Sequence, residues 1–127
     1  MELKIIPKEK YVNILGKQYN ISIANYNFDN YFEKNNPAGA YCDLNQCNII
    51  VCDLRTHPDW KDESELSCMI EMKHLLRHEI VHAFLYESGL HANSNNTDAW
   101  ATNEEMVDWI AIQGIKIYKI WEEANAL

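Results

Sequence analysis

The longest continuous pattern in the chain predicts a helix from about Glu65 to about Ser88. Asp62 or Ser64 can cap its start, and Gly89 is a natural C-terminal stop. Apolar residues lie on several sides of this segment, which indicates a central helix packed against much of the chain. They are Ile70, Leu76, Ile80, Val81, Phe84 and Leu85. Any fold for this chain therefore has to be built around that helix.

Shorter patterns precede it. Two alternating apolar and polar runs around Gly16, in YVNILGKQYNISI, predict a β-hairpin. A short helix is expected in NFDNYFEKN, and Asn35-Asn36-Pro37 ends it. The segment GAYCDLNQCNIIVCD predicts a second hairpin with its turn near Asn45-Gln46. The stretch RTHPDWKDES then reads as a loop.

A second long helix is expected from about Thr102 to about Ala124, with Thr102 or Asn103 as its cap. The order is thus hairpin, short helix, hairpin, long helix, long helix. This order predicts an α+β domain in which the helices pack on one small antiparallel sheet made of the two hairpins. The 127 residues are enough for a single domain, spanning 1–127.

Composition narrows the partners. The formal net charge of -8 argues against a nucleic-acid backbone or an anionic membrane as the main partner. No apolar run is long enough for a signal peptide or a membrane span, so a cytoplasmic location is expected. The four cysteines then read as free thiols rather than a zinc cluster, because none forms a CxxC pair. They are Cys42, Cys47, Cys52 and Cys68.

The chemistry of the chain is concentrated in LLRHEIVHAFL. On a helix, His78 and His82 fall within about 40° of each other on one face, so their imidazoles can bind one metal ion. Glu79 lies beside them, where it can act as general base toward a metal-bound water. This is the HExxH pattern of zinc hydrolases. The alternative is two histidines that share a surface or a core, but a central helix makes free solvation of both unexpected.

A catalytic zinc needs a third protein ligand, and the last helix offers Glu104 and Glu105 in NEEMVDW. Helical phase groups Glu104 with an apolar stripe formed by Val107, Ala111, Ile115 and Tyr118. A carboxylate on a buried stripe needs a partner such as a metal, so Glu104 is the expected ligand. Asp108, one turn later and near the same face, and Asn103 are expected to accept the ring N–H groups of the histidines. Asn103 as a simple cap and Asp108 as an exposed residue remain the alternatives.

Together, HEIVH and NEEMVD resemble the gluzincin class of zinc metallopeptidases, which carry HExxH on one helix and Asn-Glu-x-x-x-Asp on a later one. The resemblance covers Leu75 to about Tyr118 and implies a zincin-like fold. It implies one Zn²⁺ held by His78, His82 and Glu104, with Asp108 and Asn103 behind them. It also implies an edge strand above the site, assigned here to CNIIV. The short chain resembles minimal zincin-like proteins of bacteria and their phages, and more distantly peptidases that cleave phage-type repressors.

One departure from the large gluzincins concerns the group that stabilises the transition state. Those enzymes supply it from a further subdomain, which is not expected within these 127 residues. Tyr86, His91 and Tyr41 are the candidate donors here, and Tyr86 is favoured because it lies one turn past His82.

The sequence therefore predicts a small zinc metallopeptidase whose peptide substrate adds to a sheet edge. The alternative is a non-catalytic binding or scaffold protein whose zinc locks two helices together. A metal-free protein is a third interpretation.

Overall fold

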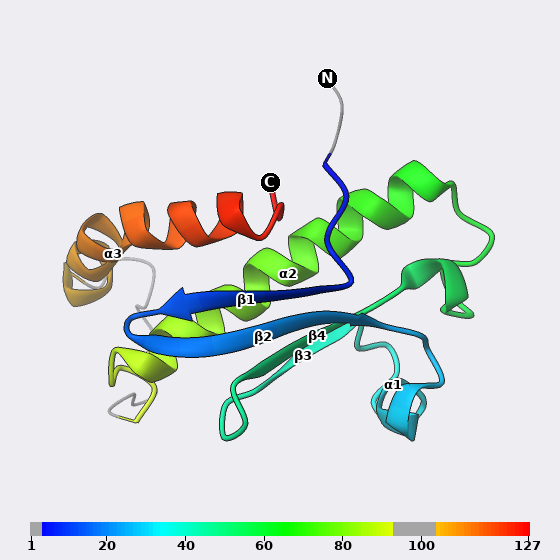
Figure 1. The fold of residues 1–127 in the computed structure, drawn as a ribbon, viewed down its shortest axis with the longest axis horizontal. Coiled ribbons are helices and arrows are strands. Elements are labelled where there is room, and N and C mark those ends of the chain that lie inside the picture. Colours follow the sequence, from blue (N-terminus) through cyan, green and yellow to red (C-terminus); the bar gives the residue numbers. More distant parts are fainter. Residues whose placement is uncertain (1–3, 93–103) are drawn as a thin grey trace.

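The computed structural model describes residues 4–92 and 104–127, with Glu104, Val107 and Ala111 described by their backbone alone. The strands are β1 (Glu9–Ile14), β2 (Lys17–Ala24), β3 (Ala40–Asp43) and β4 (Asn48–Cys52). The helices are α1 (Tyr31–Lys34), α2 (Glu65–Glu87) and α3 (Glu104–Glu123), with short 3-10 helices η1 (Phe28–Asn30) and η2 (Leu54–Thr56). The element order confirms an α+β chain with two hairpins and two long helices (Figure 1).

The four strands form one sheet in the order β1-β2-β4-β3. Both hairpins are antiparallel, but β2 and β4 run parallel, so the expectation of a purely antiparallel sheet is wrong. Parallel neighbours need a long connection, and the segment that contains α1 and β3 provides it. The sheet is therefore mixed, with β1 and β3 at its edges.

This topology also corrects the expected edge strand. Apart from Cys47, the CNIIV segment lies in β4, which has β2 on one side and β3 on the other. Ile49, Ile50, Val51 and Cys52 are all buried. Such a continuous apolar run is typical of an interior strand rather than an edge. The edge strand of this hairpin is β3.

The main core lies between the sheet and α2, which packs across β3, β4 and β1. Alternate strand residues supply the sheet side of that core: Val12, Ile14, Tyr19, Ile21, Ile49 and Val51. The short α1 packs against β3, with the ring of Tyr31 stacked on Tyr41 at a centroid distance of 3.8 Å. In Figure 1, α3 runs beside α2 and β1.

Local signals set the ends of α2. The Ser64 side chain accepts a hydrogen bond from the backbone N–H of Ser67 at 3.0 Å, which confirms Ser64 as the N-cap. At the other end Gly89 adopts a φ of 87°, a left-handed conformation that favours glycine. These two residues confine the helix to within one residue of the expected bounds.

The C-terminal end of α3 is tied to the middle of α2. Lys73, although almost fully buried, donates from Nζ to the carbonyl of Asn125, and Arg77 donates to the carbonyl of Ala126 at 2.8 Å. The indole N–H of Trp121 donates to the carbonyl of Arg77 at 3.3 Å. The bonds from Lys73 and Arg77 satisfy carbonyls just past the end of α3, and all three bonds fix where α3 lies along α2. None of the helices in the described part of the chain has the length and apolar character of a membrane crossing.

Candidate metal centre

The two histidines of the HExxH pattern converge on one point. His78 and His82 lie on successive turns of α2, and their Nε2 atoms are 3.1 Å apart. Their rings meet edge to face with centroids 4.8 Å apart. Because the two Nε2 atoms face each other, both nitrogens that could bind a metal point toward the same small volume.

This separation fits a shared metal ion. Two nitrogens bound tetrahedrally at about 2.0–2.1 Å from one zinc ion lie about 3.3 Å apart. The pair at 3.1 Å is already close to that spacing. In the metal-free chain one neutral imidazole can donate its Nε2 proton to the other, which holds the pair in place. The donor set and its spacing therefore fit zinc.

Both imidazoles are exposed, which corrects the expectation that a central helix would keep them from water. The buried stripe of α2 runs through Met72, Leu76, Ile80 and Ala83. The two histidines lie outside this stripe, on the flank of the helix next to Glu79. Partial desolvation of the ring, and next His78 and His91, lower the pKa of His82. A lowered pKa favours the neutral imidazole that a metal requires.

Glu79 differs from its neighbours because it points toward the sheet. Its side chain is only 8% exposed, and burial raises the pKa of its carboxyl group from 4.5 to about 7. Burial, and next the Glu79 carboxylate, raise the pKa of the Cys42 thiol to about 12, so Glu79 lies close to β3. A carboxyl group with a pKa near neutrality is suited to both take and give a proton.

The register of β3 shows which backbone groups face its open side. The N–H of Cys52 donates to the carbonyl of Gly39 at 2.8 Å, so that residue pair is hydrogen-bonded. Bonded and non-bonded pairs alternate along an antiparallel ladder. Tyr41 and Asp43 therefore bond toward β4, and the N–H and C=O groups of Ala40 and Cys42 face outward. The open edge thus passes next to Glu79, a feature that sequence reasoning assigned to the wrong strand.

The helical phase expected for α3 is wrong. Ile115 and Tyr118, which the sequence placed on a buried stripe with Glu104, are 71% and 52% exposed. The residues that pack are instead Ile117, Ile120 and Ala124. The helix carries apolar residues around most of its circumference, so two stripes competed and the wrong one was selected. The burial argument for Glu104 over Glu105 therefore no longer holds.

Of the other predicted site residues on or next to α3, the structure describes the side chain of Asp108 alone. Asp108 is exposed rather than inward-facing. Asn103 and the side chain of Glu104 lie outside the described residues, so their roles stay predictions. Among the described side chains, no set of three His, Cys, Asp or Glu residues is placed to hold an ion. A three-ligand site would therefore draw its third ligand from a position that the structure does not describe.

The three candidate donors occupy different places. His91 lies near enough to lower the pKa of His82, and its ring is 5.7 Å from that of Tyr86. Tyr86 is one helical turn past His82, so these two residues border the histidine pair. Successive side chains of a strand point to opposite faces of the sheet, so Tyr41 projects from the face opposite to Cys42. There its ring stacks on that of Tyr31. The structure thus brings Tyr86 and His91, but not Tyr41, to the side of α2 that carries the site.

Comparisons of the chain with known protein families, with curated proteins and with solved structures find no match. The geometry of α2 and β3 is thus the structural evidence on function.

Proposed function

We propose that this protein is a small zinc-dependent metallopeptidase with a zincin-like arrangement of its site. The observation that carries the proposal is the pair of Nε2 atoms 3.1 Å apart on α2, with a buried carboxylate between them in sequence. A structural zinc site has no need for a buried general base next to its ligands, and it generally uses four protein ligands. The combination of His78, Glu79 and His82 fits a site that performs hydrolysis.

His78 and His82 would hold the ion through Nε2, and Glu104 is the third ligand that the gluzincin resemblance assigns. When bound, zinc supplies a Lewis acid that polarises a peptide carbonyl and lowers the pKa of a water. The two histidines fix the position of the ion relative to Glu79, because all three side chains leave the same two turns of one rigid helix.

Glu79 would move the proton. As a carboxylate it takes a proton from the attacking water, and as a carboxylic acid it passes that proton to the leaving amine nitrogen. Burial raises its pKa toward neutrality, which brings both forms within reach at cellular pH. Tyr86 and His91 border the same side of the site and are the residues available to donate a hydrogen bond to the substrate oxygen.

The substrate would be an extended peptide that pairs with β3. The outward N–H and C=O groups of Ala40 and Cys42 can bond its main chain, as in other cases of strand addition. Because Glu79 lies close to Cys42, a peptide bound there passes beside the general base.

The test compares Glu79→Gln with the wild type on a generic unfolded protein substrate. The variant should keep its zinc and lose turnover by at least about 1,000-fold, because the proton acceptor is removed while the ligands remain. Glu71→Gln is the matched control, since Glu71 lies on the same helix but pairs with His74 at 2.9 Å. Activity that persists in Glu79→Gln would contradict the mechanism. Bound zinc without turnover in the wild type would favour a binding or scaffold role.

A further inference from the structure

The face of β3 that points away from α2 carries a stacked pair of tyrosines. Tyr41 and Asp43 have their side chains on this face, because Ala40 and Cys42 occupy the opposite one. The ring of Tyr31, in α1, lies on that of Tyr41 with centroids 3.8 Å apart and planes 29° apart. Both tyrosines are only half-buried. Part of this aromatic pair therefore stays accessible along the open edge of β3.

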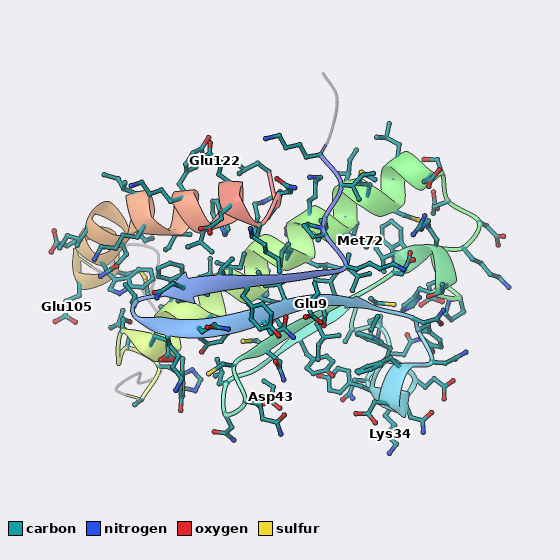
Figure 2. All side chains as sticks on the ribbon, viewed as in Figure 1. Glu9, Lys34, Asp43, Met72, Glu105 and Glu122 are labelled. Atoms are coloured by element: carbon teal, nitrogen blue, oxygen red, sulfur yellow. The ribbon has the colours of Figure 1, made fainter. Side chains whose placement is uncertain are left out.

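Two carboxylates lie beside the tyrosine pair. Burial is the largest cause that raises the pKa of the Tyr41 hydroxyl, the charge of Asp29 is the next, and Tyr31 and Asp43 raise it further. Both carboxylates are therefore close to that hydroxyl. Neither forms an ion pair with another residue in the part of the chain that the structure describes. Figure 2 shows Lys34, at the end of α1, well apart from Asp43.

A buried carboxyl group on the other face of β3 also points to a ligand at this edge. Glu79 is only 8% exposed, and it has no hydrogen-bond or ion-pair partner among the described residues. It lies close to Cys42, whose backbone N–H and C=O groups face outward. A peptide bonded to those groups would have Glu79 on one of its faces and the tyrosine pair on the other.

Strand geometry decides which substrate residue meets the tyrosines. Residues that lie opposite each other in neighbouring strands point their side chains to the same face of the sheet. The substrate residue opposite Tyr41 therefore points to the tyrosine pair, with its Cβ about 5 Å from that of Tyr41. The substrate residues before and after it point toward α2. This holds for either direction of the bound peptide.

We propose that this face of β3 selects basic peptides, with a lysine or arginine at the position opposite Tyr41. The inference rests on the proposed function, because it takes the peptide along β3 to be the substrate. The aliphatic stem of such a side chain packs against the tyrosine rings, and its cationic head reaches Asp29 and Asp43. Both carboxylates would repel a glutamate at the same position. The net charge of -8 also attracts basic peptides, but it does not distinguish one position from the next.

Cleavage of a positional series of peptides by the zinc-loaded wild type tests the preference. One lysine is moved through successive positions of an extended alanine-threonine peptide, and a second series carries glutamate instead. At one fixed distance from the cleaved bond, lysine should be favoured over glutamate at least about tenfold in kcat/KM. At the two adjacent positions, whose side chains point toward α2, the ratio should stay below about threefold. High salt should lower the large ratio, since the carboxylates are partly exposed.

Amide variants of the two carboxylates remove the charge and keep the local structure. Asp29 has a φ of 53°, a conformation that asparagine adopts readily, and Oδ1 of Asp43 accepts two backbone N–H groups, from Asn45 and Gln46, as an amide oxygen also can. Asp29→Asn and Asp43→Asn should each lower the lysine-to-glutamate ratio at least about threefold. Glu9→Gln is the matched control, because Glu9 is exposed on β1 at the opposite edge of the sheet, and it should leave the ratio unchanged. Circular dichroism shows that each variant is folded.

Binding to Glu79→Gln separates this inference from the proposed function. Fluorescence anisotropy compares labelled peptides that carry lysine or glutamate at every second position. Tighter binding of the lysine peptide, lost when Asp29→Asn is added, would support the selective face even if the wild type cleaves nothing and the peptidase proposal fails. Cleavage by the wild type with equal kcat/KM for lysine and glutamate at every position would overturn the selective face alone. Equal effects of Asp29→Asn and Glu9→Gln on the ratio would also overturn it, and neither binding nor cleavage of any peptide would overturn both proposals.

Discussion

The burial of Glu79 makes a quantitative prediction about stability in the absence of metal. Burial raises the pKa of this carboxyl group from 4.5 to about 7, so the folded chain binds its proton more tightly than the unfolded chain does. The resulting stabilisation is complete below pH 4.5 and is lost as the pH rises through 7. Metal-free wild type should therefore become less stable between these two values, and Glu79→Gln should lack this component.

The size follows from the same pKa values. At about 1.4 kcal/mol for each pKa unit between 4.5 and about 7, the full effect is about 3.5 kcal/mol. Between pH 5 and pH 8, linkage gives about 2.5 kcal/mol of it. This is a large part of the free energy of unfolding of a domain of this length. It is the stability that the folded chain loses when the buried carboxyl group ionises.

Urea unfolding in the presence of a chelator measures the effect at several pH values from 5 to 8. The difference in unfolding free energy between wild type and Glu79→Gln should change by about 2.5 kcal/mol across that range. Glu105→Gln controls for the loss of one negative charge, because Glu105 is exposed on α3 (Figure 2). If this difference stays constant within about 0.5 kcal/mol from pH 5 to pH 8, burial does not raise the pKa of Glu79 and the reasoning is refuted.

Two further predictions concern parts of the proposed site beyond α2. Glu104→Ala should lower zinc affinity at least about 100-fold and Glu105→Ala should leave it nearly unchanged, as measured by competition with a chromogenic chelator; the reverse order would assign the metal to Glu105. Cys42→Pro removes an N–H group that faces the open side of β3, so the protein should fold but lose at least about tenfold in kcat/KM. Cys42→Ala keeps that N–H group and should retain activity, and equal losses in both variants would show that the β3 backbone does not bind substrate.

Local signals in the sequence predicted local structure well. The N-cap Ser64 and the left-handed Gly89 define both ends of α2, and each acts within one turn of the helix. The two hairpins were predicted for the same reason, since alternation and turn residues are neighbours in sequence. The parallel pairing of β2 with β4 was missed because it depends on how a 23-residue connection between them crosses the sheet, which no local pattern specifies.

In the candidate site, too, the features set by local spacing were predicted and those set by tertiary packing were not. His78, Glu79 and His82 could be found because helical spacing alone brings them together. Two features could not: the open strand beside the site, which follows from the sheet order, and the buried side of α3. On α3, Ile115 and Ile117 belong to competing apolar stripes, and only packing against α2 and β1 decides which one is buried.

The zinc content of three proteins tests the central claim most directly. Wild type should bind one zinc ion per chain, and His78→Ala should lose it, because one of the two converging Nε2 atoms is removed. His74→Ala is the matched variant, since His74 lies one turn earlier on the same helix and pairs with Glu71 instead. It should keep the full zinc content. A wild type that binds no zinc, or a His78→Ala protein that binds as much as His74→Ala, would contradict the account.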